Sequence, residues 1–272
     1  MKYLYAAAAA CLSTVATSAA AQETAPPADI TVTGSVALVS DYRFRGVSQT
    51  DEEMALQGGL TVTHSSGVYA GTWASNLAGW GTFGGSNIEL DLYAGYKADL
   101  GGGAALDVGL TWYMYPGGLD TTDFAEGYAK LSGTLGPVNA LAGVAYAPKQ
   151  RALGNFSNTP FSAGQSEDNL YLWGDLSSGV PGTPVTVKAH LGYSDGNPGL
   201  GPNGTSLSPT GSYLDYLVGA DVVVGPLTLG VAYTGTDISR AESAYIQPNF
   251  SSTKDGSSIA AGKVLFSVSA AF

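Results

Sequence analysis

Residues 87–97 read NIELDLYAGYK, and the side chains of this segment alternate between two chemical types. The even-numbered positions are apolar or aromatic, namely Ile88, Leu90, Leu92, Ala94 and Tyr96. The charges lie on the odd-numbered positions, at Glu89, Asp91 and Lys97. Side chains of a β-strand point to opposite faces with a period of two. The segment therefore predicts a strand that meets lipid on one face and water or polar groups on the other.

The same alternation recurs along the chain. It is clear at 104–115, 184–194, 213–225 and 227–236, where the charges again keep to one face. Weaker alternation occurs at 31–44, 54–64, 67–77, 124–133, 138–147 and 168–177, and a final strand, KVLFSVSAAF, occupies 263–272. Charge is costly on a lipid-facing surface, and bacterial single-chain barrels have an even number of strands. We therefore predict an all-β fold: a transmembrane antiparallel up-and-down β-barrel of about twelve strands over residues 30–272. A soluble β-sandwich or small ligand-binding barrel is the alternative, and the confinement of the charges opposes it.

The connections between these strands fall into two alternating classes. Short, turn-forming connections occur at 64–67, 99–103, 134–137, 178–184 and 224–226. Longer ones occur at 46–53, 78–86, 116–123, 149–167, 195–212 and 238–260. Outer-membrane barrels have short periplasmic turns and longer extracellular loops. The longer connections are therefore predicted to be extracellular.

The N-terminus and the composition point to an exported, acidic chain. Residues 1–21 place Lys2 before an apolar run that ends in small residues, which predicts a secretory signal peptide followed by a short polar segment at 22–29. Removal of the signal peptide takes away Cys11, the only cysteine, and leaves acidic residues in excess of basic ones. Nucleic-acid binding requires clustered Lys and Arg, so this composition excludes a nucleic-acid binder. The predicted location is the bacterial outer membrane, reached through the periplasm.

The segment SDYRFRGVSQT, residues 40–50, interleaves arginines with aromatic residues. Continuation of the first strand through it would turn Tyr42 and Phe44 toward lipid at the rim. Asp41, Arg43 and Arg45 would then point into the lumen near the external mouth. The charges would either set ion selectivity there or pair with lumenal carboxylates such as Glu89 or Asp91 and stiffen the barrel; both interpretations stay open.

This segment, followed by ALQGG (55–59), GVYAGTWASN (67–76) and IELDLYAGY (88–96), resembles the opening of the TorF family of porins. The resemblance is most specific over residues 35–97. It implies an outer-membrane, porin-like barrel in a Gram-negative bacterium. It supplies no solute and no catalytic residue.

The alternation also predicts which charges line the lumen. The predicted lumenal or mouth charges are Asp41, Arg43, Arg45, Glu89, Asp91, Lys97, Asp107, Glu126, Lys130, Asp175, Lys188, Asp215, Asp221 and Lys263. Acids outnumber bases in this set, which predicts a mild cation preference. The function indicated is a porin, in which small hydrophilic solutes or ions diffuse passively. The alternative is a plugged structural or adhesive barrel whose extracellular loops are the functional surface.

The last strand carries a separate signal. It ends at Phe272 with no tail, and a terminal phenylalanine that closes an alternating strand resembles the C-terminal signal read by the barrel-insertion machinery. The partners expected are therefore this machinery, outer-membrane lipid and lipopolysaccharide, and small hydrophilic solutes. The oligomeric state is not indicated.

Enzymatic and cofactor chemistry finds little support. The G-x-G-x-x-G letters at 199–204 stand in a Pro-containing polar stretch without the strand and helix that a nucleotide site needs. His64 and His190 are the only histidines, too few for a zinc site without carboxylate ligands. An outer-membrane hydrolase would need a base beside the loop acids, such as Asp51, and no histidine is predicted there. We therefore expect no cofactor, no bound metal and no enzymatic activity, and we interpret His190 as a residue of the lumen wall.

Overall fold

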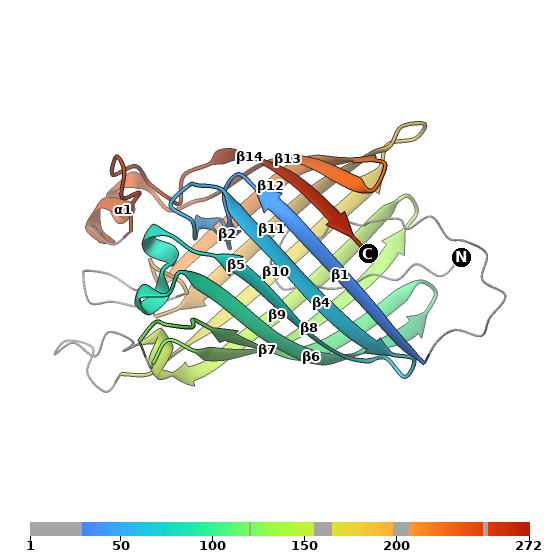
Figure 1. Cartoon of the computed structure of the whole chain (residues 1–272), viewed down its shortest axis with the longest axis horizontal. Coiled ribbons are helices and arrows are strands. Elements are labelled where there is room, and N and C mark those ends of the chain that lie inside the picture. Colours follow the sequence, from blue (N-terminus) through green and yellow to red (C-terminus); the bar gives the residue numbers. More distant parts are fainter. Residues whose placement is uncertain (1–28, 120, 155–164, 198–206, 247–249) are drawn as a thin grey trace.

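The computed structural model describes residues 29–119, 121–154, 165–197, 207–246 and 250–272, and it is a closed antiparallel β-barrel (Figure 1). Twelve strands form its wall, and each is hydrogen-bonded to the neighbours expected of an up-and-down barrel, with β1 closing on β14. They are β1 (Ile30–Val39), β4 (Ala55–His64), β5 (Val68–Asn76), β6 (Ile88–Gly101), β7 (Ala104–Met114), β8 (Phe124–Leu135), β9 (Val138–Gln150), β10 (Glu167–Gly179), β11 (Val185–Gly196), β12 (Ser212–Val224), β13 (Leu227–Thr236) and β14 (Lys263–Ala271). The predicted fold class and strand number are confirmed. The predicted signal peptide and the 199–204 segment lie outside the described residues.

The barrel closes between its first and last strands. Gly34 and Phe272 exchange two backbone hydrogen bonds, 2.7 Å from the Gly34 amide and 2.9 Å from the Phe272 amide. A Cβ atom on Gly34 would lie only 2.6 Å from the Phe272 ring, so the absence of a side chain there makes room for the terminal aromatic. Phe272 is 76% exposed on the outer face of this seam. The last residue of the chain is thus part of the closing sheet.

The outer face of the wall is apolar. Along β6, for example, Leu92 is exposed while its neighbours Asp91 and Tyr93 are buried. The tyrosine and tryptophan residues of the outer face that are exposed by two-fifths or more are Tyr96, Trp112, Tyr146 and Tyr233. Such amphipathic rings suit the interface between hydrocarbon and headgroups. The strands therefore present lipid with an apolar band and keep charge inside.

The two ends of the barrel differ in their connections. Short turns lie at the end where β1 begins and the C-terminus lies, and the longer connections gather at the other end (Figure 1). The longer connections carry η1 (Gly79–Gly81), η2 (Phe83–Gly85), η3 (Arg151–Leu153) and α1 (Arg240–Ile246). At the start of α1 the Ser239 amide donates to Glu242 (2.8 Å) and the Glu242 amide donates to the Ser239 hydroxyl (3.2 Å), a capping box. No helix among the described residues is long and apolar enough to span a bilayer.

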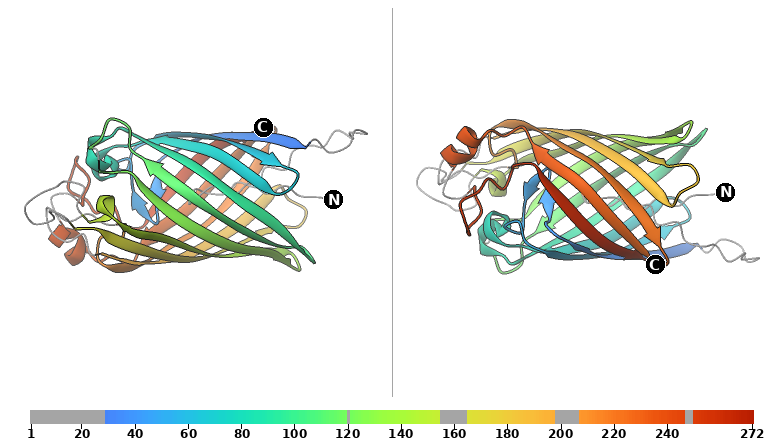
Figure 2. Two further views of the ribbon diagram at one scale, coloured as in Figure 1. Left: turned by 90° about the horizontal axis from the view of Figure 1, so that it is seen from below. Right: turned by 90° about the horizontal axis from the view of Figure 1, so that it is seen from above.

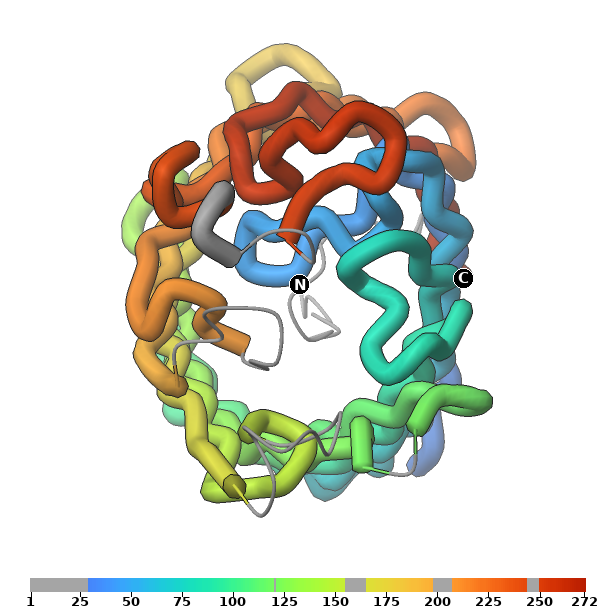
Figure 3. Tube along the Cα trace, turned by 90° about the vertical axis from the view of Figure 1, so that its left-hand side faces the viewer, coloured from blue at the N-terminus to red at the C-terminus, as the bar shows by residue number. Residues whose placement is uncertain are grey.

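The predicted first strand, 31–44, is wrong beyond Val39. There β1 ends, and residues 40–54, which we call the inward segment, turn into the barrel and return to β4 (Figures 2 and 3). The segment contains a small hairpin of β2 (Arg43–Phe44) and β3 (Val47–Ser48), with Arg45 (φ 49°) and Gly46 (φ 80°) at its tip in left-handed conformations. Alternation of residue types continues through Phe44, so the pattern by itself does not mark this bend.

Glycines on the lumen side of the wall make space for large rings. A Cβ atom on Gly143 would lie 2.3 Å from the indole of Trp173, and one on Gly95 would lie 2.5 Å from the Tyr69 hydroxyl. Each ring therefore lies across a glycine of a nearby strand. A ring in this position replaces the packing that the glycine lacks in the sheet. The high glycine and tyrosine content of the chain is explained in part by this packing.

Candidate functional site

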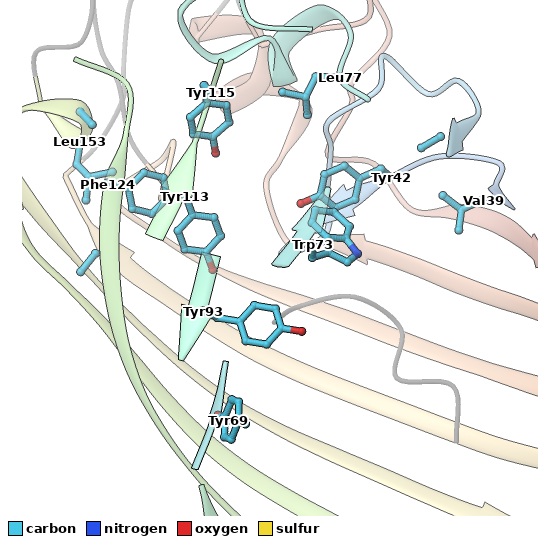
Figure 4. Packing of buried hydrophobic residues seen from close by; sticks show 13 residues of the cluster. Val39, Tyr42, Tyr69, Trp73, Leu77, Tyr93, Tyr113, Tyr115, Phe124 and Leu153 are labelled. Atoms are coloured by element: carbon cyan, nitrogen blue, oxygen red, sulfur yellow. The ribbon is translucent and has the colours of Figure 1, made fainter. Parts of the chain in front are cut away.

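The inward segment packs on one side against aromatic residues of β5 to β8. The Tyr42 ring meets Trp73 edge-on at 5.4 Å between ring centroids, and Phe44 meets Tyr113 at 6.0 Å. Tyr113 in turn stacks on Phe124 at 4.5 Å. Figure 4 shows the rings of Tyr42, Trp73, Tyr113 and Phe124 converging on the interior of the barrel. Tyr42 and Phe44 thus do not face lipid, and the prediction that they form part of the outer rim is wrong.

The other side of the segment packs against the connection between β13 and β14. A second buried cluster contains Val47, Tyr213, Ile238, Phe250, Ile259 and Ala260. The Ser48 amide donates a 3.0 Å hydrogen bond to the Ile259 carbonyl. Asp51 is also buried and accepts a 2.8 Å hydrogen bond from the Thr253 amide. The segment is thereby held on both sides within the loop end of the barrel.

Arg43 anchors the base of the inward segment. Its Nε atom donates to Asp41 at 2.8 Å, and its Nη1 atom donates to the carbonyls of Gly46 (3.0 Å) and Ala261 (2.7 Å). Nη2 pairs with Glu52 at 3.3 Å. Burial raises the pKa of Asp41, although the charge of Arg43 opposes the shift. Every nitrogen of the Arg43 guanidinium therefore has a partner.

Arg45, at the tip of the hairpin, reaches the opposite wall. Its Nη2 atom pairs with Glu126 of β8 at 2.6 Å, and its guanidinium carbon lies 4.1 Å from the ring centroid of Tyr171 in β10. In the order of strands around the barrel, β8 and β10 flank β9, the strand farthest from β1. Burial alone would lower the pKa of Arg45, but the Glu126 carboxylate raises it above its ordinary value. The inward segment thus bridges the lumen from wall to wall.

Ion pairs line the wall on the turn side of this bridge. Lys130 pairs with Asp107 at 3.1 Å, and Asp107 also accepts a hydrogen bond from the Tyr69 hydroxyl at 2.5 Å. Lys188 contacts both carboxylate oxygens of Asp221 at 2.7 Å. These pairs join neighbouring strands across the inner surface, as expected of cross-strand pairs.

His190 belongs to a network that joins three strands. Its Nδ1 atom lies 2.6 Å from Asp175, and its Nε2 atom lies 3.1 Å from Asp215 and 2.9 Å from the Tyr171 hydroxyl. Tyr171 also donates to Asp215 at 3.1 Å. Both ring nitrogens are therefore engaged, and the histidine is part of the wall.

Two lumenal carboxylates have no ion-pair partner among the described residues. Glu89 accepts hydrogen bonds from the hydroxyls of Tyr42 (2.8 Å) and Tyr115 (3.3 Å). Asp91 is 3% exposed, and its Oδ1 atom has no hydrogen-bond partner. Both carboxyl groups therefore lie in the interior without a cationic partner in the described part of the chain.

The structure places the predicted lumenal charges in or at the rim of one interior. Asp41, Arg43 and Arg45 lie in the inward segment, Lys97 pairs in register with Asp107, and Lys263 contacts Glu52 at 3.1 Å. The predicted wall positions in this interior are Glu89, Asp91, Asp107, Glu126, Lys130, Asp175, Lys188, Asp215 and Asp221. The two arginines do pair with carboxylates of the interior, but the partners are Asp41, Glu52 and Glu126 and not Glu89 or Asp91.

Several contributing residues were missed by the sequence analysis. Tyr42, Tyr115 and Tyr171 donate hydroxyl hydrogen bonds to lumenal carboxylates, and Glu52 joins Arg43 to Lys263. The position of Tyr171 on the lumen face could have been found from the alternation in β10. The partners of Tyr42 and Glu52 could not, because they depend on the inward turn. Within the described ranges, no group of three or more His, Cys, Asp or Glu side chains is arranged to hold a metal ion.

Comparisons with known proteins were made for the whole chain. A family model described as a bacterial protein of unknown function (Gcw_chp) matches residues 21–272. The structure of KdgM porin in complex with disordered oligogalacturonate is similar, with a TM-score of 0.50 and 9% identity over 89% of this chain and 97% of that one. A structure from work on in-meso crystallization of membrane proteins gives a TM-score of 0.51 and 10% identity, over 88% of this chain and 83% of that one. These likenesses establish a porin-like barrel fold.

A search of curated proteins found no significant match to this sequence. The expected TorF relationship is not confirmed by the comparisons, whereas the porin-like barrel that it implied is.

Proposed function

The chain belongs to the Gcw_chp family of bacterial proteins of unknown function, and we propose that it is a narrow outer-membrane channel for passive diffusion of small hydrophilic solutes or ions. The observation that carries the proposal is the contrast between the two faces of the barrel. The outer face is apolar, whereas the inner face holds the charged and hydroxyl-bearing side chains. A polar interior inside an apolar band is the arrangement of membrane channels built from strands.

The mechanism is diffusion rather than chemistry. The residue closest in type to a general base, His190, has both ring nitrogens engaged by Asp175, Asp215 and Tyr171. A general base needs a nitrogen directed at a substrate proton. We therefore assign these side chains to the wall of a pathway and propose no hydrolase activity.

We propose a mild preference for cations. Carboxylates outnumber cationic side chains among the predicted lumenal charges, and Glu89 and Asp91 lack ion-pair partners within the described part of the chain. The cations Arg43, Arg45, Lys130 and Lys188 are each paired with a carboxylate. Unneutralised carboxylates in a low-dielectric passage attract cations and repel anions.

The location and partners follow from the same proposal. The chain would be exported by its N-terminal signal peptide and inserted in the outer membrane, with lipid and lipopolysaccharide around its apolar band. The seam that contains Phe272 would be the part presented to the insertion machinery, since its ring is exposed at the end of β14. Cell fractionation of the full chain and a Phe272 variant would test both points.

The experiment that tests the channel is single-channel recording from the refolded mature protein in a planar bilayer under a salt gradient. Discrete current steps with a cation-selective reversal potential are expected. The double variant Glu89→Gln/Asp91→Asn should reduce the cation preference, whereas Asp99→Asn, which changes an exposed carboxylate near a short turn, should leave it unchanged. Anion selectivity of the wild type would refute the proposed preference.

A plugged structural barrel is the second candidate, and a specific observation favours it. The inward segment bridges the lumen and packs against buried clusters on both sides. If the segment fills the remaining cross-section, the long connections become the functional surface. Absence of current from protein that is folded and inserted would support this candidate over the channel.

A further inference from the structure

The guanidinium of Arg45 occupies a small cage between the tip of the inward segment and the wall strands β8 and β10. Glu126 supplies a carboxylate at 2.6 Å. The Tyr171 ring supplies a π face at 4.1 Å from the guanidinium carbon, and the Phe44 ring lies at 4.7 Å. A carboxylate combined with aromatic faces is the environment that recognises guanidinium and alkylammonium groups. The cage thus has the composition of a binding site for an organic cation, and a side chain of the protein itself fills it.

The occupant is poorly satisfied. Arg45 is only 4% exposed, yet its Nε and Nη1 atoms have no hydrogen-bond partner among the described residues. Its backbone is also in the left-handed region at φ 49°, which is unfavourable for a residue other than glycine. Buried donors without partners destabilise the state that buries them. Arg43, each of whose guanidinium nitrogens has a partner, shows that the same segment can hold an arginine with far better hydrogen bonding.

The surroundings of the cage offer additional hydrogen-bond acceptors. Asp91 lies within electrostatic range of both Glu89 and Glu126, and its Oδ1 atom is buried with no hydrogen-bond partner among the described residues. Glu126 pairs with Arg45, whereas Glu89 and Asp91 have no cationic partner in the described part of the chain. A ligand with a cationic head and further hydrogen-bond donors would satisfy more of these acceptors than Arg45 does.

We propose that the cage formed by Glu126, Tyr171 and Phe44 is a binding site for a small organic cation that carries a guanidinium or ammonium group. Such a ligand displaces the Arg45 side chain, while Arg43 keeps the base of the inward segment in place. This inference rests on the proposed channel function and names the class of solute for that channel. Once the ligand has displaced it, the Arg45 side chain no longer ties the inward segment to the far wall.

The test measures binding by titration calorimetry on refolded protein in detergent micelles, with L-arginine as the probe and L-citrulline as its uncharged near-isostere. Arg45→Ala removes the tethered competitor, so it should bind L-arginine at least about tenfold more tightly than the wild type. Addition of Glu126→Gln to that variant should abolish the gain. Arg45→Lys, which refills the cage, and Arg240→Ala, which changes an exposed helix residue, should behave like the wild type.

The outcomes separate this proposal from the channel function. If Arg45→Ala is folded but binds L-arginine no better than L-citrulline, or if Glu126→Gln leaves the gain intact, the proposed site is wrong. If Arg45→Ala does not fold, Arg45→Gln gives the same test with a longer side chain. Tight, Glu126-dependent binding by a protein that passes no current would refute the channel and leave the cation site standing.

Discussion

The pair formed by Lys188 and Asp221 gives a sharp test of how the lumen is stabilised. The ammonium contacts both carboxylate oxygens at 2.7 Å, and the two side chains are 12% and 10% exposed. Asp221 has no other hydrogen-bond partner among the described contacts of its carboxylate. Lys188→Met keeps most of the aliphatic stem and removes the charge, so it leaves Asp221 largely buried without compensation.

The expected cost can be bounded from the burial of the pair. Removal of one partner of a fully buried ion pair costs about 3–5 kcal/mol, because the remaining charge is desolvated and unpaired. Both side chains retain some contact with solvent, which lowers the expectation to about 2–3 kcal/mol for Lys188→Met. Replacement of both partners by apolar residues is often close to neutral. Lys188→Met/Asp221→Leu should therefore recover most of the loss.

The assay is urea unfolding of the barrel refolded into phospholipid vesicles, followed by tryptophan fluorescence. Lys149→Met is the matched control, because Lys149 and Glu167 are 4.0 Å apart and their side chains are 67% and 33% exposed. Exposed pairs of this kind contribute less than about 1 kcal/mol. Equal effects of Lys188→Met and Lys149→Met would show that the lumen solvates its charges and would refute the reasoning.

Three other predictions test separate features of the fold. Gly143→Ala places a Cβ atom 2.3 Å from the Trp173 ring. It should destabilise the barrel by about 1–3 kcal/mol in the same unfolding assay. Gly179→Ala is the control, because a Cβ atom there meets no atom within 4 Å and should leave the stability unchanged. Phe272→Ser should lower the amount of folded barrel in outer-membrane fractions several-fold while leaving the refolded protein competent, and equal amounts in cells would contradict the proposed assembly signal. Hydrogen bonds from Ser239 lower the pKa of Glu242. A carboxylate with a depressed pKa contributes stability above its unfolded pKa and loses that contribution as the pH falls through the folded pKa. The protection factors of the α1 amides, which correct for the intrinsic pH dependence of exchange, should therefore fall at acidic pH and depend less on pH in Glu242→Gln.

The fold was predictable because strand alternation is a local property of the chain. In β6 and β7 the apolar and charged positions separate cleanly, and each residue's face is set by its parity alone. The number of strands and the class of each connection followed by repetition. The predicted wall charges, such as Asp107 and Lys188, could be placed on the inner face for the same reason.

The candidate site was less accessible to sequence reasoning. Tyr42 and Phe44 continue the alternation of β1, yet the chain bends at residue 40 and turns them inward. A bend of this kind is stabilised by contacts far along the chain, such as the hydrogen bonds from Arg43 to Ala261 and from Ser48 to Ile259. Local patterning contains no information about such partners.

Alternation along the chain is enough to specify a barrel of about twelve strands with an apolar outside and a charged inside, because side-chain parity acts residue by residue. The bridge across the lumen and the contacts of Arg45 with Glu126 and Tyr171 depend instead on the tertiary structure. Arg45 is distant in sequence from both residues, and the segment that carries it follows β1, which lies nearly opposite β8 and β10 in the ring. Closure of the barrel sets which walls face each other, and pairing across the lumen follows from that closure.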